Sequence, residues 1–191
     1  MDFRQIRTMS VSKHHPLPTP RALATAGLAP EVVDALLSLD ASMFQWMRAV
    51  MRGEMPSHIL AELNSDLDFA QFQALTAVTR LQFGIGRPAP TEATIGLLAE
   101  EMHIDPSRAS RIATDLTERG MLRREVSQSD GRRAVLVLTD QARQVLVEFR
   151  ELKWAKQLAF LHACPEEDIL RLSQLFIRYT LEMQSTLRPN D

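Results

Sequence analysis

The sequence of 191 residues contains one cysteine and no apolar run that approaches the length of a membrane span. A single cysteine excludes an intrachain disulfide framework, which agrees with a reducing compartment. The N-terminus lacks the apolar segment of a signal peptide, and a membrane helix needs about 18 or more consecutive apolar residues. We therefore expect a cytoplasmic protein with no membrane partner.

Patterns of enzymes and metal proteins are also missing. We find no Gly-rich phosphate loop, no cluster of metal ligands and no nucleophile beside a base at a usable spacing. The adjacent His14 and His15 lack a nearby third ligand and so make a poor metal site. We expect no enzymatic activity, no cofactor and no metal. A net charge of −2 argues against indiscriminate binding to polyanions, but it permits a local basic patch.

What the chain does contain is a pair of short helical patterns in the segment 94–120. Thr94 is a suitable N-cap for the first helix, whose apolar stripe is formed by Ile95, Leu98, Ala99 and Met102. After a break at His103, Asp105 can cap a second helix that starts at Pro106, a residue suited to the first helical position. Gly120 ends this helix in the left-handed conformation. Two helices joined by a tight turn form a helix-turn-helix.

Beyond Gly120 the apolar period changes from about 3.6 to about 2. The runs 122–126 and 134–138 are short and β-prone, and a polar loop of residues 127–133 separates them. This pattern predicts a β-hairpin, or wing. Its tip carries Asp130, Gly131, Arg132 and Arg133.

A helix and a thin β-loop of this kind suit double-stranded DNA. The second helix can enter the major groove, and an arginine on the wing can reach the adjacent minor groove. Residues 105–133 contain seven arginines and five acids, so they carry a net +2 within a chain of net −2. The expected DNA-binding residues are Ser107, Arg108, Ser110, Arg111, Thr114, Asp130, Arg132 and Arg133. We expect Asp130 to orient Arg132 by a charge-assisted hydrogen bond.

The segment TIGLLAEEMHIDPSRASRIATDLTERGMLRREVSQSDGRRAVLVLT resembles the winged-helix core of MarR-type (multiple-antibiotic-resistance regulator) transcription factors. The wing resembles that family's Asp-x-Arg signature, here Asp130-Gly131-Arg132, and the flanking helices match in order and length past residue 28. Two positions depart from the family pattern. His103 and Ala142 stand where glycine is common, and His103 puts the left-handed geometry of the turn in question.

Long helices are predicted on both sides of the winged helix. They span about 30–52, 68–83, 140–162 and 166–187, with a helical connector at 56–63, and Gln71 completes a capping box with Asp68. The first and last have more apolar surface than one packing partner can cover. We expect four segments. Residues 1–28 form an extended arm with Phe3, Ile6 and Met9 as spaced anchors, or else a disordered tail. Residues 29–66 form a dimerisation helix and connector, residues 67–139 the DNA-binding domain, and residues 140–191 the C-terminal dimerisation helices.

The predicted fold class is therefore mainly α with a small β-wing, a winged helix-turn-helix domain flanked by long terminal dimerisation helices. We expect a homodimer, which would read a pseudo-palindromic operator with half-sites about one helical turn apart. The resemblance implies the same pairing through the terminal helices. It also implies a transcription regulator, with repression relieved by a small molecule as the leading hypothesis.

The resemblance further implies a cleft between the dimerisation helices and the winged domain for small aromatic or phenolic effectors. The candidate contacts are Trp46, Met47, His58 and Phe72, which a simple core role would also explain. Two alternatives to a ligand-released repressor remain. One is a winged-helix module for protein contacts without ligand control. The other is a redox-responsive regulator that uses Cys164, although a purely structural cysteine fits its position beside Pro165 better.

Overall fold

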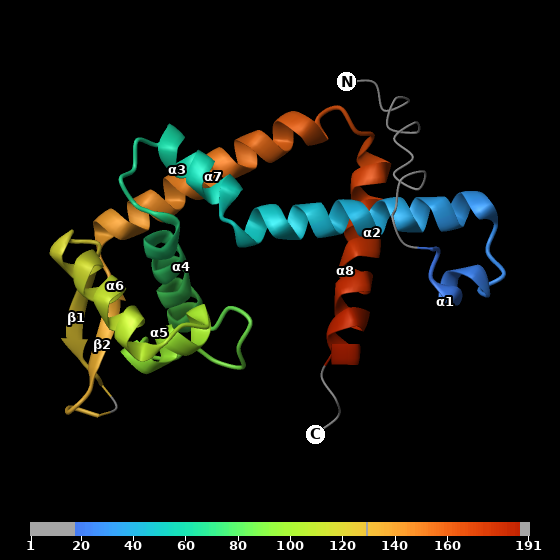
Figure 1. Ribbon diagram of the computed structural model, residues 1–191. Coiled ribbons are helices and arrows are strands. Elements are labelled where there is room, and N and C mark those ends of the chain that lie inside the picture. Colours follow the sequence, from blue (N-terminus) through green and yellow to red (C-terminus); the bar gives the residue numbers. More distant parts are fainter. Residues whose placement is uncertain (1–17, 129, 188–191) are drawn as a thin grey trace. The chain divides into compact units, whose positions relative to one another are not determined.

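The structure is a computed structural model that describes residues 18–128 and 130–187. It is mainly helical, with one two-stranded antiparallel sheet in the described residues. The predicted fold class, mainly α with a small β-wing, is confirmed, whereas dimerisation through the long helices stays a prediction (Figure 1). The elements are α1 (Arg21–Ala24), α2 (Pro30–Met51), α3 (Glu54–Glu62), α4 (Phe69–Phe83), α5 (Ile95–Met102), α6 (Pro106–Glu118), β1 (Leu122–Val126), β2 (Ala134–Leu138), α7 (Asp140–Leu161) and α8 (Glu166–Leu187).

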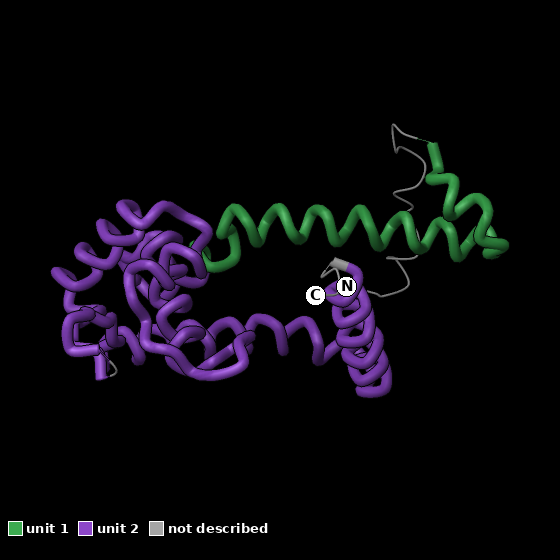
Figure 2. The backbone as a smooth tube through the Cα atoms, turned by 90° about the horizontal axis from the view of Figure 1, so that it is seen from below, with its two compact units in different colours: residues 1–58 green, residues 59–191 purple. Residues whose placement is uncertain are grey.

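The chain divides into two compact units, residues 1–58 and residues 59–191 (Figure 2). The described part of the first unit holds α1, α2 and the start of α3. The second unit holds the end of α3 and all later elements, so the complete winged helix lies in it. The four segments expected from the sequence divide the chain by role, and that division stays a prediction.

Two short helices differ from expectation. Residues 21–24, part of the expected extended arm, form α1, because Arg, Ala and Leu after Pro20 are good helix formers. The anchors Phe3, Ile6 and Met9 and the histidines 14 and 15 lie outside the described residues. Helix α3 begins at Glu54, two residues before the predicted start. Pro56 is tolerated there because backbone N–H groups in a first helical turn have no partner within the helix.

Side-chain caps define where the helices of the second unit begin. The caps of α4, α5, α6 and α7 are Asp68, Thr94, Asp105 and Thr139, and each accepts a hydrogen bond from a backbone N–H in the first turn. Each therefore satisfies one of the donors that a helix start leaves unpaired. These boundaries agree with the prediction.

The turn of the helix-turn-helix keeps its left-handed residue without glycine. His103 has φ 52° and ψ 46° and ends α5. The N–H of Ile104 then bonds to the carbonyl of Ala99 at 3.0 Å, which satisfies one of the last carbonyls of the helix. Histidine accepts this conformation at a cost that glycine would avoid.

The core of the second unit lies where α4, α5 and α6 meet the sheet (Figure 1). Its largest side chains are at most 2% exposed and come from every one of these elements, namely Leu75, Val78, Leu81, Leu98, Leu116, Leu122 and Leu138. Phe72 packs on Phe149 of α7 with ring centroids 4.2 Å apart. Phe83, the last residue of α4 before the left-handed Gly84, is 67% exposed.

The sheet is the predicted hairpin. Leu122 pairs with Leu138 and Val126 with Ala134 in antiparallel register. A further backbone hydrogen bond of 2.7 Å joins the N–H of Leu136 to the carbonyl of Ala93, just before α5. The wing is thus attached to the helix-turn-helix through its second strand.

The long helices α2 and α8 contain no buried side chain within the described residues, yet both carry large apolar ones. Helix α2 exposes Phe44, Trp46 and Met47 by 56–58%. Helix α8 exposes Leu172, Phe176 and Leu181 by 54–61%. In the part of the chain that the structure describes, no helix has the length and apolar character needed to cross a membrane.

Candidate nucleic-acid interface

Helix α6 presents a polar face outward. Ala109, Ala113 and Leu116 are fully buried on its inner side. The predicted residues Ser107, Arg108, Arg111 and Thr114 are exposed, whereas Ser110 is half-buried between the two faces. A helix whose packed side consists largely of alanines lies close to its support and leaves its polar side accessible. This arrangement is suitable for insertion into a DNA major groove.

The start of α6 is organised by Asp105. Its carboxylate accepts hydrogen bonds from the Ser107 hydroxyl and, at 2.8 Å, from the backbone N–H of Arg108. The Ser107 hydroxyl and then the Arg108 N–H hold the pKa of Asp105 below its ordinary value. Ser107 therefore has a structural bond at the position where we expected a DNA contact. Its hydroxyl oxygen still has acceptor capacity.

A residue outside the predicted set reaches the exposed side of α6. Arg124 of β1 donates from Nη2 to the Thr114 hydroxyl at 3.0 Å. The two-residue period of a strand places Arg124 on the same side of β1 as Leu122, which faces the core. This two-residue period is the sequence signal from which the position of Arg124 could have been predicted. Arg124 adds positive charge beside the central turn of α6.

The wing tip is a tight turn built around Asp130. The Asp130 carboxylate accepts the backbone N–H of Arg132 at 3.1 Å, and the Arg133 N–H bonds to the Asp130 carbonyl at 2.9 Å. Among the described residues, Asp130 makes no bond with the Arg132 guanidinium. Asp130 thus shapes the turn, and the expected bond between the two side chains is not formed. Arg132 and Arg133 are both exposed.

The base of the wing is held by Glu92, which the sequence did not single out. Its carboxylate accepts hydrogen bonds from the hydroxyl of Ser127, 5% exposed, and from the Gln128 N–H at 2.7 Å. Ser127 in turn accepts the Asp130 N–H at 3.0 Å. A chain of polar contacts therefore runs from the residues before α5 to the wing tip. No local pattern marks Glu92, because its partners lie 35 and 36 residues away.

Helix α5 is fixed by an ion-pair cluster. Glu101 accepts from Arg80 Nε at 2.7 Å and from Arg87 Nη2 at 2.7 Å, and its side chain is only 17% exposed. The hydrogen bond from Arg80, followed by the one from Arg87, lowers the pKa of Glu101 from its ordinary 4.5. The cluster joins the first helix of the motif to α4 and to the loop after it.

The arginines of the outer face keep their charge available. Among the described residues, the guanidinium groups of Arg108, Arg132 and Arg133 have no carboxylate partner. Other arginines of the unit, such as Arg119 and Arg123, are paired with acids. These three guanidinium groups therefore form no ion pair at the first turn of α6 or at the wing tip, the two places where DNA contact is expected.

The other candidate residues lie as follows. Trp46 and Met47 are 58% and 56% exposed on α2, and His58 is exposed on α3. Phe72 is 6% exposed within the core of the second unit. Cys164 is half-buried between α7 and α8. The described residues contain no group of three or more acidic, histidine or cysteine side chains that could hold a metal ion.

Comparison with known proteins shows what the winged-helix segment is similar to. Residues 65–133 match the family model described as the MarR family. A search of curated proteins finds no sequence match.

Solved structures share the fold over most of the chain. A MarR family protein from Bacillus stearothermophilus has a TM-score of 0.62 at 16% identity, covering 79% of this chain and 97% of its own. RV1404 from Mycobacterium tuberculosis has a TM-score of 0.58 at 16% identity, covering 80% and 97%. A MarR-like transcriptional regulator from Thermotoga maritima has a TM-score of 0.55 at 21% identity, covering 78% and 96%. The predicted resemblance is confirmed.

Proposed function

Since residues 65–133 match the MarR family model and the chain shares its fold with a solved MarR family protein, we propose that this protein is a sequence-specific DNA-binding transcription regulator. It acts as a homodimer, and it represses its target until a small molecule releases it. Fold alone does not define function. The proposal therefore rests on the surface that the fold presents.

The observation that carries the proposal is that α6 and the wing, two elements of one unit, both present arginines without an ion-pair partner. Arg108 lies on the outer face of α6 and Arg132 at the wing tip, and both lack an acidic partner among the described residues. A winged helix used only for protein contacts has no need of arginines at these positions. Phosphate contacts by such side chains make binding to duplex DNA fall steeply as salt rises.

The first experiment selects duplexes from a randomised pool with the purified protein. We expect an inverted repeat with half-site centres about one helical turn apart. Affinity for the selected duplex is then measured by fluorescence anisotropy at several salt concentrations, with a scrambled duplex of equal composition as control. Failure to enrich any sequence would contradict a sequence-specific function. Binding that does not change with salt would favour the protein-interaction alternative.

The exposed apolar surface of α8 supports the homodimer. Leu172, Phe176 and Met183 recur at spacings of four and seven residues, and their exposed fractions lie between 43% and 59%. Water contact of this extent on several large side chains is unfavourable by about 25 cal/mol per Å². A second copy of the chain would cover this surface symmetrically. Sedimentation equilibrium tests this step.

Control by a small aromatic molecule is the further part of the proposal. A structure of MepR from Staphylococcus aureus, which shares the fold with a TM-score of 0.52 at 16% identity, is described as bound to ethidium bromide. Trp46, Met47, His58 and Phe72 remain the candidate contacts. Thermal-shift screening of small aromatic molecules, followed by the loss of DNA binding in their presence, tests it. Trp46→Phe should weaken the response to an active compound, whereas Trp154→Phe should leave it intact.

The redox alternative depends on Cys164, the one cysteine of the chain. Its test is direct. Treatment with peroxide would abolish DNA binding of the unsubstituted protein and spare Cys164→Ser if the thiol were the sensor. Equal behaviour of both proteins would remove this alternative.

A further inference from the structure

Gln71 has a role beyond the helix start that its sequence position predicts. Its backbone N–H donates to the Asp68 carboxylate at 2.7 Å, and its side-chain oxygen accepts the Asp68 N–H at 2.8 Å. These bonds complete the capping box of α4. They use only the oxygen of the amide, although the side chain is 8% exposed and its nitrogen also needs a partner.

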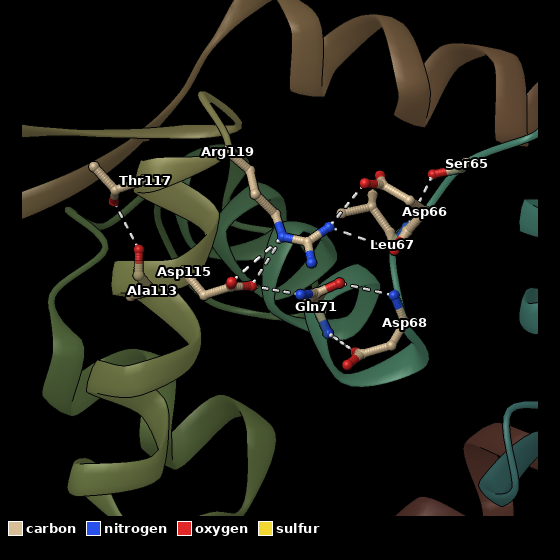
Figure 3. Close-up of polar contacts among 9 residues, drawn as sticks. All are labelled: Ser65, Asp66, Leu67, Asp68, Gln71, Ala113, Asp115, Thr117 and Arg119. Carbon is tan, nitrogen blue, oxygen red and sulfur yellow. Dashed lines mark hydrogen bonds and ion pairs between the residues drawn. The ribbon is translucent and has the colours of Figure 1, made fainter.

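The partner of the amide nitrogen lies on helix α6. The amide nitrogen of Gln71 donates to Oδ2 of Asp115, 44 residues further along the chain (Figure 3). Asp115 also receives Arg119 Nε at 3.2 Å, and Arg119 Nη1 reaches the Asp66 carboxylate at 3.1 Å. Figure 3 shows these side chains as one connected network that joins α6 to the first turn of α4 and to the residues before it. Each contact in it is polar and directional.

The apolar packing of α6 defines its rotation about the helix axis only weakly. Two of its three buried side chains are alanines, Ala109 and Ala113. Alanines bring a helix close to its neighbours but give few steric features that define its rotation about its own axis. Hydrogen bonds weaken steeply with misalignment and so can define that rotation. Asp115 lies one turn after Arg111 and one residue after Thr114, so its direction determines theirs.

We propose that Gln71 and Asp115 are positioning residues that hold α6 at the rotation in which Arg108, Arg111 and Thr114 face DNA. This inference rests on the proposed function. The two ends of the Gln71 amide are not interchangeable, because its oxygen only accepts and its nitrogen only donates. The capping box takes the oxygen, and so the nitrogen must face α6.

This polarity suggests a charge-reversal test. Gln71→Glu keeps the capping box, because a Glu side chain at that position also accepts the N–H of the capping residue. It also places a second carboxylate against Asp115. We expect the affinity for the selected duplex to fall about tenfold or more relative to that for the scrambled duplex, since like charges at this distance repel.

Two further variants complete the cycle. Asp115→Asn retains an acceptor for Gln71 but loses the ion pair with Arg119, and we expect its specificity ratio to fall less than that of Gln71→Glu. The double variant Gln71→Glu/Asp115→Asn reverses donor and acceptor, because the amide introduced at position 115 can donate to the carboxylate introduced at position 71. It has the original net charge, and we expect it to recover the specificity that Gln71→Glu loses.

Controls separate positioning from charge and from stability. Gln73→Glu adds the same charge on the exposed side of α4, and it should leave the ratio unchanged. Urea unfolding defines conditions in which each variant is fully folded. Should Gln71→Glu fail to fold, Gln71→Met removes the contact without adding charge and should also lower the ratio.

The outcomes distinguish the two proposals. If the unsubstituted protein enriches no sequence from the pool, the proposed function fails. If it does, and Gln71→Glu or Gln71→Met keeps its full specificity ratio, the positioning role is wrong. A double variant as unspecific as Gln71→Glu alone would overturn it as well. Loss in the single variant with recovery in the double variant supports it.

Discussion

Leu116 in α6 and Leu172 in α8 are the same residue type on amphipathic helices, yet the first is fully buried and the second is 59% exposed. The winged helix buries its apolar residues within one unit and directs its polar ones into specific bonds. Helices α2 and α8 carry comparable apolar content without such cover. The difference indicates that the winged helix is stabilised by its own core, whereas the apolar side chains of the long helices are available to the partner surface that we propose.

The largest effect should come from the core. Leu75→Ala removes a fully buried side chain of α4 and should lower the free energy of unfolding by about 2–5 kcal/mol, since it leaves a cavity. Urea unfolding followed by circular dichroism measures it. Leu172→Ala is the matched change at an exposed site. At protein concentrations at which the chain is monomeric, it should lower the free energy of unfolding by about 0.5 kcal/mol or less. Equal losses would break the comparison.

The next effect concerns the exposed face of α8. Phe176→Ala should weaken the proposed dimer by about 2 kcal/mol, or about 30-fold in its dissociation constant, because aromatic anchors dominate such interfaces. Sedimentation equilibrium measures the constant. Gln174→Ala, on the opposite side of the same helix, should not change it. An unchanged constant in Phe176→Ala would remove this face from the interface.

A smaller effect should follow from the wing. Arg132→Ala should weaken binding to the selected duplex by about 1–3 kcal/mol and leave the free energy of unfolding unchanged, since its guanidinium has no partner in the described protein. Anisotropy titration measures the affinity. Arg150→Ala removes an exposed arginine of α7 and controls for net charge. Unchanged affinity at physiological salt would exclude the wing from DNA binding.

The smallest effect is a pH dependence. The bonds from Arg80 and Arg87 lower the pKa of Glu101 below 4.5 in the folded state. The ionised group therefore stabilises the fold above the unfolded pKa, and this contribution is lost as pH falls through the lower folded pKa. Glu101→Gln should cost about 1 kcal/mol at neutral pH and make the loss in acid shallower. Thermal unfolding at pH values from neutral to acid measures this dependence, and Glu100→Gln, at an exposed position of the same helix, is the control. Parallel pH profiles for Glu101→Gln and the unsubstituted protein would contradict the role of Glu101.

The sequence by itself determined the elements of this protein. Local signals such as the Asp105 cap, Pro106 and Gly120 predicted the bounds of α6, and the change of apolar period predicted both strands residue for residue. Each of these signals acts within a few residues, because caps, turns and periodicity depend on the backbone nearby. The errors were local too. They fall at α1, at the start of α3 and at the wing tip, where Asp130 bonds to the backbone of Arg132 and not to its guanidinium.

Only the tertiary structure decided how the polar face of α6 and the wing are held. Gln71 was recognisable as half of a capping box, but its contact with Asp115 depends on the packing of α4 against α6. Glu92 at the base of the wing and Arg124 beside Thr114 likewise acquire their partners only when the hairpin folds onto the helices. The local sequence around a polar side chain does not predict which distant group it will contact. That choice is made when buried surfaces bring the helices together, and directional bonds then define their orientation.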